Sequence, residues 1–188
     1  PAWHEPGQPP PAGLVPLGPD PASALQEFAH VGSGMVPARD PTTGRLVLDG
    51  HSAVVLVLLP GGTFRMGAQK ADPAAANHDP AALPDEGPVH EVTLSPFLLG
   101  KHEVTQAQWK QLTEGEAPSV LQAGQEREGR TILPTNPVEL ISWEDAHRWL
   151  ERHRLGLPTE AQWEYACRAG TGTPWAFGGD VKVLGDHG

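Results

Sequence analysis

The most reactive side chain in this 188-residue sequence is its single cysteine, Cys167. A thiol becomes a nucleophile or a metal ligand when a neighbouring base or cation lowers its pKa and solvent reaches it. The charged neighbour is Arg168, which a helix would direct to a different side. We therefore interpret Cys167 as a buried structural thiol, with a half-cystine to a segment outside the sequence as the alternative. A single cysteine also excludes a disulfide within the chain.

Nine histidines raise the question of a metal site. Zinc peptidases place two histidines four residues apart around a glutamate, and neither His90-Glu91 nor His102-Glu103 is followed by that second histidine. His147 and Glu151 are four residues apart and would share a helix face. One such pair on a polar face is usually solvated, so the sequence predicts no metal there.

Oxygen ligands for calcium gather in the segment 68–87. Calcium loops place such ligands at close, regular intervals around a glycine, and this segment has neither feature. We expect a mobile surface loop instead. Its acidic and amide side chains are Asp72, Asn77, Asp79, Asp85 and Glu86. Gly61-Gly62 predicts a turn rather than a phosphate cradle, because no helix pattern follows it.

Charge and composition exclude several classes of function. The net charge is −10, from 13 Lys and Arg against 23 Asp and Glu, so nucleic acid and anionic membrane surfaces would be repelled. The longest apolar run, residues 53–60, is shorter than the roughly 20 residues that a membrane-spanning helix needs. No signal-peptide pattern is visible at the N-terminus. We expect a cytoplasmic protein with no nucleic-acid or membrane partner.

The elements that must position these side chains fall into three parts. Residues 1–21 contain eight prolines and predict a semi-rigid linker that can form neither a ladder nor a helix. Residues 22–52 predict a short helix over 22–30 and then a hairpin with a strand at 45–48. Residues 53–188 predict the main domain.

Strand patterns come first within that domain. The β-branched run 54–59 predicts a buried strand, and 63–67 predicts a second one after the break at residues 60–62. Residues 90–94 and 97–99 predict a strand pair joined at Ser95-Pro96. Residues 114–136 predict a long polar loop.

Three helix starts of one design follow. Thr105 with Gln108, Ser142 with Asp145, and Thr159 with Gln162 fit the capping box or its close variant. The helices are predicted over about 105–113, 142–153 and 159–169. Strands followed by helices with irregular loops between them predict an α+β fold rather than an alternating α/β fold.

Several phrases have an order and spacing that resemble the formylglycine-generating-enzyme/sulfatase-modifying-factor family. The resemblance covers about residues 54–178, and its most specific part is the phrase from Leu157 to Ala166. The phrases are Pro60-Gly61-Gly62-Thr63-Phe64-Arg65-Met66-Gly67, residues 86–92, Glu103-Val104-Thr105, Pro137-Val138, residues 142–146, residues 157–166 with Arg168, and Pro174-Trp175.

The resemblance implies a C-type-lectin-like fold in which Thr159 caps a helix, Glu160, Trp163 and Tyr165 wedge that helix against a sheet, and Trp143 and Trp149 lie in the core. It also implies that His90 makes a structural hydrogen bond. The residues that we expect to serve the structure rather than catalysis are Gly67, His90, Glu103, Thr105, Trp143, Pro158, Thr159, Glu160, Trp163, Glu164, Tyr165, Cys167 and Arg168.

The resemblance further implies that this sequence is the N-terminal half of the family's domain. The copper-binding cysteine pair and the calcium sites of the family belong to the other half, so we expect no catalytic residue and no cofactor in this chain. Copper or calcium is expected only together with that half. The first partner we expect is therefore the C-terminal half itself, as a second chain or a fragment released by proteolysis, and another protein is expected besides.

Three functions stay open at this point. The first, which we favour, is a non-catalytic lectin-like recognition module of a larger bacterial signalling or defence protein. The second is part of a copper-dependent oxidase that converts a substrate cysteine to formylglycine. The third is a diversified ligand-binding protein. The first and third are not separated by anything in residues 1–188.

Overall fold

The computed structural model describes residues 12–179 and 182, and the described chain forms two compact units. The first unit runs to Leu59 and resumes over Phe97–Leu157. The second unit consists of Pro60–Pro96 and the chain from Pro158 onward. Each unit is therefore built from two separate stretches of sequence.

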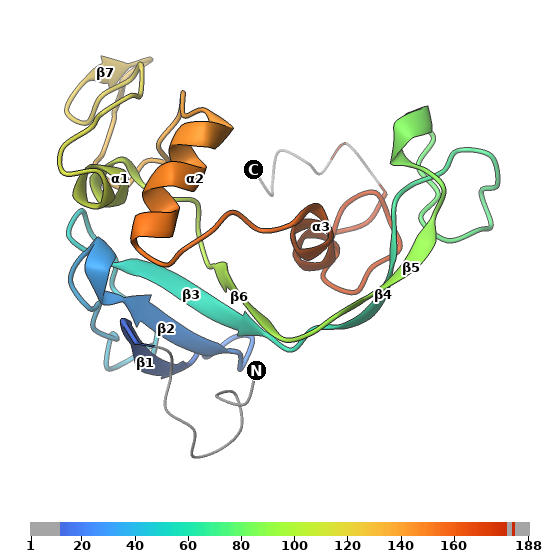
Figure 1. Ribbon diagram of the computed structural model, residues 1–188, viewed down its shortest axis with the longest axis horizontal. Helices are drawn as coiled ribbons and strands as arrows, with labels where there is room; N and C mark the ends of the chain where they lie inside the picture. The colour runs from blue at the N-terminus through green and yellow to red at the C-terminus, as the bar shows by residue number, and fades with distance from the viewer. Residues whose placement is uncertain (1–11, 180–181, 183–188) are drawn as a thin grey trace. The chain divides into compact units, whose positions relative to one another are not determined.

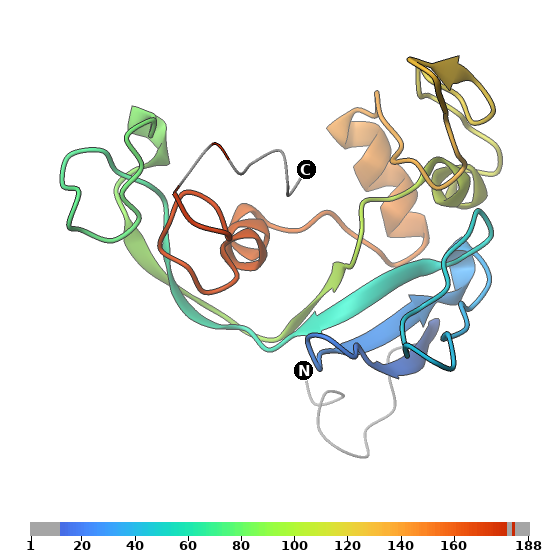
Figure 2. The same cartoon turned by 180° about the vertical axis from the view of Figure 1, so that it is seen from behind.

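A four-stranded antiparallel sheet forms the base of the first unit (Figure 1). Its strands are β1 (Leu14–Pro19), β2 (Gln26–His30), β3 (Val54–Leu59) and β6 (Phe97–Gly100), in the order β1-β2-β3-β6. Helices α1 (Gln106–Leu112) and α2 (Trp143–Arg152) lie on the same side of this sheet, as the view from behind also shows (Figure 2). The buried apolar side chains come from the strands and from both helices: Phe28, Ala29, Ala53, Val54, Val55, Leu56, Phe97, Trp109, Leu112 and Leu150.

The N-terminal part of this sheet corrects two expectations. Residues 14–19 are strand β1 rather than part of a linker, and residues 26–30 are strand β2 rather than a helix. Proline is tolerated in β1 because β1 is the edge strand, and the register shifts between Pro16 and Gly18. The expected linker over residues 1–11 lies outside the described residues.

The second unit contains a hairpin and one helix. Strands β4 (Gly62–Met66) and β5 (His90–Leu94) pair antiparallel, and helix α3 (Glu160–Arg168) lies against both. The expected pairing of residues 90–94 with 97–99 is therefore wrong, because β5 pairs with β4 whereas β6 pairs with β3. Ser95-Pro96 is the passage from one unit to the other rather than a turn between partners.

All three predicted helices are present with their caps. Thr105 and Thr159 each form a complete capping box with the glutamine three residues on. Ser142 accepts the Asp145 amide at 3.0 Å, and its hydroxyl donates to the Asp145 carboxylate at 2.8 Å. The local cap pattern therefore determines where these helices begin.

The connecting segments contain little regular structure. They hold short 3-10 turns at Val31–Ser33 and Pro84–Glu86, and a small hairpin of β7 (Glu126–Arg127) and β8 (Arg130–Thr131). The strand expected at 45–48 is reduced to one bridge between Arg39 and Leu46. Within residues 12–179 and 182, no helix has both the length and the apolar character needed to cross a membrane.

Candidate functional site

Glu164 and Arg168 of α3 together hold one glycine of the β4–β5 hairpin. The Gly67 amide donates to Glu164 Oε1 at 2.8 Å, and Arg168 donates to the Gly67 carbonyl at 2.9 Å and to Glu164 at 2.7 Å. The two side chains are four residues apart, so they share one helix face. Their charges neutralise each other and both backbone groups of Gly67 are bonded, which makes this cluster a structural clamp.

Gly67 is the residue that this clamp requires. Its φ is +91°, and a Cβ placed on it would lie 2.5 Å from the Glu86 carbonyl oxygen. Asn77 adds a third contact from the loop, since its amide group donates to the Arg65 carbonyl at 2.7 Å and to the Gly67 carbonyl at 2.8 Å. The loop that carries Asn77 is thus tied to the hairpin at this point.

Tyr165 holds the start of the hairpin from the same helix. Its hydroxyl donates to the Gly61 carbonyl, and its ring meets Phe64 edge to face with centroids 5.3 Å apart. Such an aromatic pair adds about 0.5–1.5 kcal/mol beyond the area that it buries. Tyr165 therefore wedges α3 against the hairpin as expected.

The opposite face of α3 is open to solvent. Glu160, Trp163 and Cys167 are spaced three and four residues apart along it, and all three are exposed, with 60% of Trp163 accessible. The expectations that Cys167 is a buried thiol and that Glu160 and Trp163 wedge the helix are therefore wrong. The physical reason is the clamp, which turns Glu164, Tyr165 and Arg168 toward the hairpin and these three side chains away from it.

The first unit presents a second exposed indole. Trp143, expected in the core, is 62% accessible and stacks on His147 with centroids 4.8 Å apart. Trp149 is half-buried beneath Arg152, whose guanidinium carbon lies 4.4 Å from the ring centroid. Leu150 alone among the described α2 residues is buried, so it anchors the helix to its unit.

Glu103 and Thr105 line a cavity of about 520 Å³ in the first unit. Its floor is Ala53 with the buried start of β3 (Val54, Val55), and one wall is the segment Lys101–Thr105. Leu48 and Asp49 contribute to the lining from the segment ahead of β3. Hydrogen bonds from the His51 amide and the Ser52 hydroxyl lower the pKa of Asp49.

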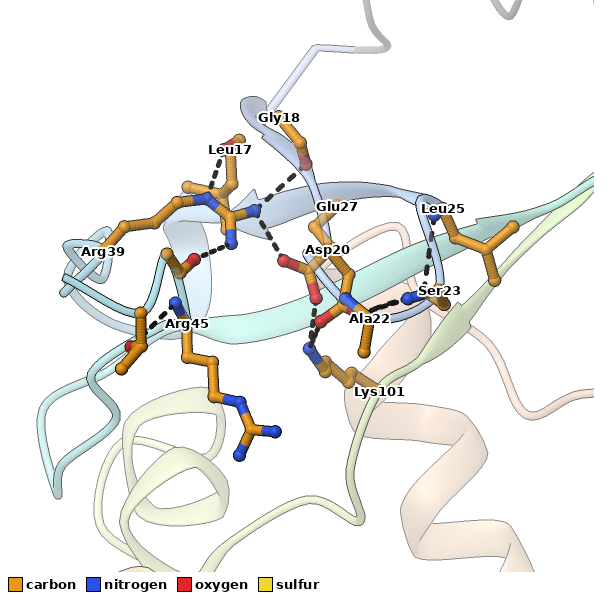
Figure 3. Close-up of polar contacts among 12 residues, drawn as sticks. Leu17, Gly18, Asp20, Ala22, Ser23, Leu25, Glu27, Arg39, Arg45 and Lys101 are labelled. Carbon is orange, nitrogen blue, oxygen red and sulfur yellow. Dashed lines mark hydrogen bonds and ion pairs between the residues drawn. The ribbon is translucent and has the colours of Figure 1, made fainter. Parts of the chain in front are cut away.

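A charge cluster around one buried carboxylate lies at the β1–β2 hairpin (Figure 3). The Glu27 side chain is fully buried, and it pairs with Arg39 at 2.7 Å and with Lys101. Lys101 also pairs with Asp20 at 2.7 Å. The bond from Lys101, together with weaker hydrogen bonds from Ser23 and the Ala22 amide, lowers the pKa of Asp20. Burial opposes the charge of Lys101, but its two carboxylate partners raise its pKa on balance.

A second missed feature is a pair of histidines that links the sheet to both helices. Nε2 of His30, on β2, lies 3.0 Å from the His153 carbonyl oxygen. Nε2 of His153 lies 2.8 Å from the Leu112 carbonyl oxygen. Nδ1 of His30 is buried without a hydrogen-bond partner. Burial lowers the pKa of His30, and the hydrogen bond to the His153 carbonyl offsets part of that effect.

Two further residues of the signature phrases, His90 and Pro158, take part in no cluster described above. His90 Nδ1 lies 3.0 Å from the Pro88 carbonyl oxygen, and Pro158 is exposed at the start of the second stretch of the second unit. Neither the cluster around Glu27 nor the one around His30 was predicted from the sequence, because residues 22–30 have the pattern of a short helix and were assigned as one. A strand assignment there would have placed Glu27 beside apolar neighbours and marked it as a buried charge.

The metal-binding side chains of the described residues do not gather into a cluster. Within residues 12–179 and 182, no group of three or more His, Cys, Asp and Glu side chains could hold an ion. Neither the copper nor the calcium that the resemblance implies finds ligands among these residues, so no chemical step is derived through either.

Comparison with known proteins connects this arrangement to one family. The formylglycine-generating enzyme of Thermomonospora curvata is 30% identical, and the match covers 70% of this chain and 55% of that protein. The inactive C-alpha-formylglycine-generating enzyme 2 of Bos taurus is 26% identical, with 66% of this chain and 52% of that protein covered. PvdO of Pseudomonas aeruginosa, a solved structure, is 26% identical with a TM-score of 0.49, over 77% of this chain and 57% of that one.

The chain thus spans about half the length of the curated relatives that it matches. The sulfatase-modifying factor enzyme 1-like domain model matches residues 49–187, which include the clamp, the helix caps and the cavity wall. The mixture of strands and helices in this chain fits the C-type-lectin-like fold that the signature phrases led us to expect. The chain belongs to the formylglycine-generating-enzyme/sulfatase-modifying-factor family.

Proposed function

We propose that this chain is part of a lectin-like recognition module that works by binding rather than by catalysis, within a larger protein. The observation that carries the proposal is the arrangement of α3. Its charged signature residues, Glu164 and Arg168, bond to each other and to the backbone of Gly67. Its exposed face carries Glu160, Trp163 and Cys167, and the described residues contain no group of three or more metal-binding side chains.

Exposed tryptophans favour a protein partner. Trp163 and Trp143 are each about three-fifths accessible, one in each unit. Tryptophan is enriched among the residues that dominate binding energy at protein interfaces, because its ring buries a large area with few rotatable bonds. Leu140, just ahead of α2, is 67% accessible and has a φ of +60°, an uncommon backbone conformation for leucine.

The partner that we propose first is the rest of the family's domain. The match covers 55% and 52% of two relatives, so a little under half of each of those proteins is left for such a part. Packing that part against Trp143 and Trp163 would cover apolar surface that a stable protein normally buries. A further protein would then be recognised by the completed module, in the cytoplasm and without nucleic acid or membrane.

The alternative is a formylglycine-generating oxidase. The name of the Thermomonospora curvata relative supports it, whereas the name of the Bos taurus relative supports a member without that activity. In this chain the one thiol, Cys167, sits on the exposed face of α3 with no metal-binding group among the described residues. A copper centre would have to be supplied by other residues.

Cys167 provides the experiment, because it lies on the same face as Trp163. The rate of maleimide labelling of Cys167 is compared between the isolated chain and the polypeptide as its gene encodes it. Burial by a packed partner is expected to slow labelling at least tenfold. Equal rates in the two samples would contradict the proposed docking face.

A second assay separates binding from oxidation. The gene-encoded polypeptide is incubated with copper, oxygen and a cysteine-containing substrate peptide, and the peptide mass is followed. We expect the peptide to remain unchanged. Conversion of its cysteine to formylglycine would overturn the binding proposal in favour of the oxidase.

A further inference from the structure

Residues 14–48 lie ahead of the family match, which begins at residue 49, yet they complete the sheet of the first unit. Strand β2 pairs with β3 from Glu27 opposite Val57 to His30 opposite Val54. Strand β1 then covers the outer edge of β2. The segment therefore covers the edge of β3 and leaves the proline-containing β1 as the edge strand of the sheet.

Arg39 ties this segment together. Its guanidinium donates to the carbonyls of Leu17 at 2.9 Å, Gly18 at 3.1 Å and Gly44 at 2.7 Å, besides the Glu27 carboxylate. Leu17 and Gly18 are at the register shift of β1, where carbonyls lose their ladder partners. Only a planar fork with five donors can satisfy such a set, so lysine could not replace Arg39.

Glu27 joins this segment to the family domain through Lys101. The Glu27 side chain is completely inaccessible, and its second cationic partner is Lys101, which lies inside the matched region (Figure 3). Lys101 reaches both Glu27 and Asp20, so two carboxylates of the segment fix one ammonium group. A buried carboxylate needs both partners, because an uncompensated charge in the interior is strongly destabilising.

Lys101 in turn begins one wall of the 520 Å³ cavity. Its amide donates to the Val55 carbonyl at 2.8 Å, which fixes the segment Lys101–Thr105 to the cavity floor. At the other end of that segment, Thr105 caps α1 and its backbone bridges to Pro137. Leu48, from the segment ahead of the match, lines the cavity as well.

We propose that residues 14–48 form a strap that shapes the cavity beside Glu103 and Thr105, and that Glu27 is its positioning residue. Glu27 acts through Lys101 and touches no cavity ligand itself. Of the strap, Leu48 lines the cavity, and Glu27 and Asp20 act on the family-matched segment Lys101–Thr105 through Lys101. The inference concerns the first unit and is independent of the proposed partner on α3.

Hydrogen exchange of the full chain, read by mass spectrometry, tests the strap. Glu27→Gln keeps the size of the side chain and removes its charge. Losing one partner of a buried charge pair should raise the exchange rate on the order of tenfold or more over residues 98–105, which include the Lys101 amide. Glu128→Gln, at a side chain that is 84% exposed, is the matched control and should change nothing there.

Two further variants keep the proposal falsifiable if Glu27→Gln unfolds the first unit. Asp20→Asn removes only the more accessible carboxylate and should accelerate exchange at Lys101 by a few-fold. Lys101→Met should have a smaller effect in the Glu27→Gln background than in the native one. Faster exchange confined to residues 14–30, with Lys101 protected as in the native chain, would overturn the proposal, as would additive effects of the two substitutions.

Discussion

Replacing Gly67 with alanine should destabilise the second unit far more than the loss of one hydrogen atom suggests. A non-glycine residue in the left-handed region costs roughly 1–2 kcal/mol. The new methyl group would also lie 2.5 Å from the Glu86 carbonyl oxygen, a backbone atom that cannot rotate away. Overpacking of this kind costs about 1–3 kcal/mol, so the sum is about 2–5 kcal/mol.

The matched control for this substitution is Gly170→Ala. Gly170 has a similar φ of +84°, but a Cβ placed there meets nothing within 4 Å. It therefore reports the backbone strain without the collision. The alanine also restricts the unfolded chain, which offsets about 0.4–1 kcal/mol in both variants.

Thermal unfolding followed by circular dichroism measures the difference. At about 2–4 °C per kcal/mol for a protein of this size, Gly67→Ala should lower the Tm by roughly 5–15 °C, and Gly170→Ala by only a few degrees. Equal Tm values for the two variants would show that the backbone near Glu86 shifts freely to accommodate the new methyl group. The clamp would then not hold Gly67 in a fixed position.

Two further predictions concern His30 and Thr159. Because burial holds the pKa of folded His30 below the ordinary value of about 6.5, its stabilising effect is complete above that pH and is lost as the pH falls through the folded pKa. The Tm should therefore fall more steeply below about pH 6.5 in the native chain than in His30→Gln, and parallel curves would refute this. Thr159→Ala removes the cap of α3 and should lower the free energy of unfolding by about 1 kcal/mol. Thr42→Ala is the control, because Thr42 is an exposed turn residue whose hydrogen bond in the turn uses its backbone amide and not its hydroxyl, and this change should be nearly neutral.

The sequence predicted the elements whose signals are local. The capping boxes of Thr105 and Thr159 located two helices to within about one residue, because the cap itself stops the helix from extending backward. The β-branched run of β3 was equally clear. Family phrases then indicated the fold, since their order along the chain is specific.

The features that depend on distant pairing were missed. Residues 22–30 have a short helical pattern, but pairing with β3 makes the last five a strand, as tertiary context overrides weak propensity. Proline in residues 14–19 argued against a strand until an edge position made it tolerable. Cys167 was interpreted as buried because no neighbouring base activates it, and the family resemblance implied that Trp163 packs against a sheet. The Glu164–Arg168 clamp, which joins distant residues, determines which side of α3 faces outward.

The two parts of the clamp, the β4–β5 hairpin and helix α3, are synthesised at different times. Gly67 and Glu164 are 97 residues apart, so the β4–β5 hairpin leaves the ribosome well before the helix that holds it. The hairpin is complete at Leu94 and α3 at Arg168, so at about 5–20 residues per second the interval between them is roughly 4–15 s. During that interval the hairpin is a two-stranded ribbon, which is marginally stable alone in water. A nascent chain of this family therefore carries an unfinished unit for seconds, and a chaperone that shields residues 60–96 would act at the moment when the protein is most exposed to aggregation.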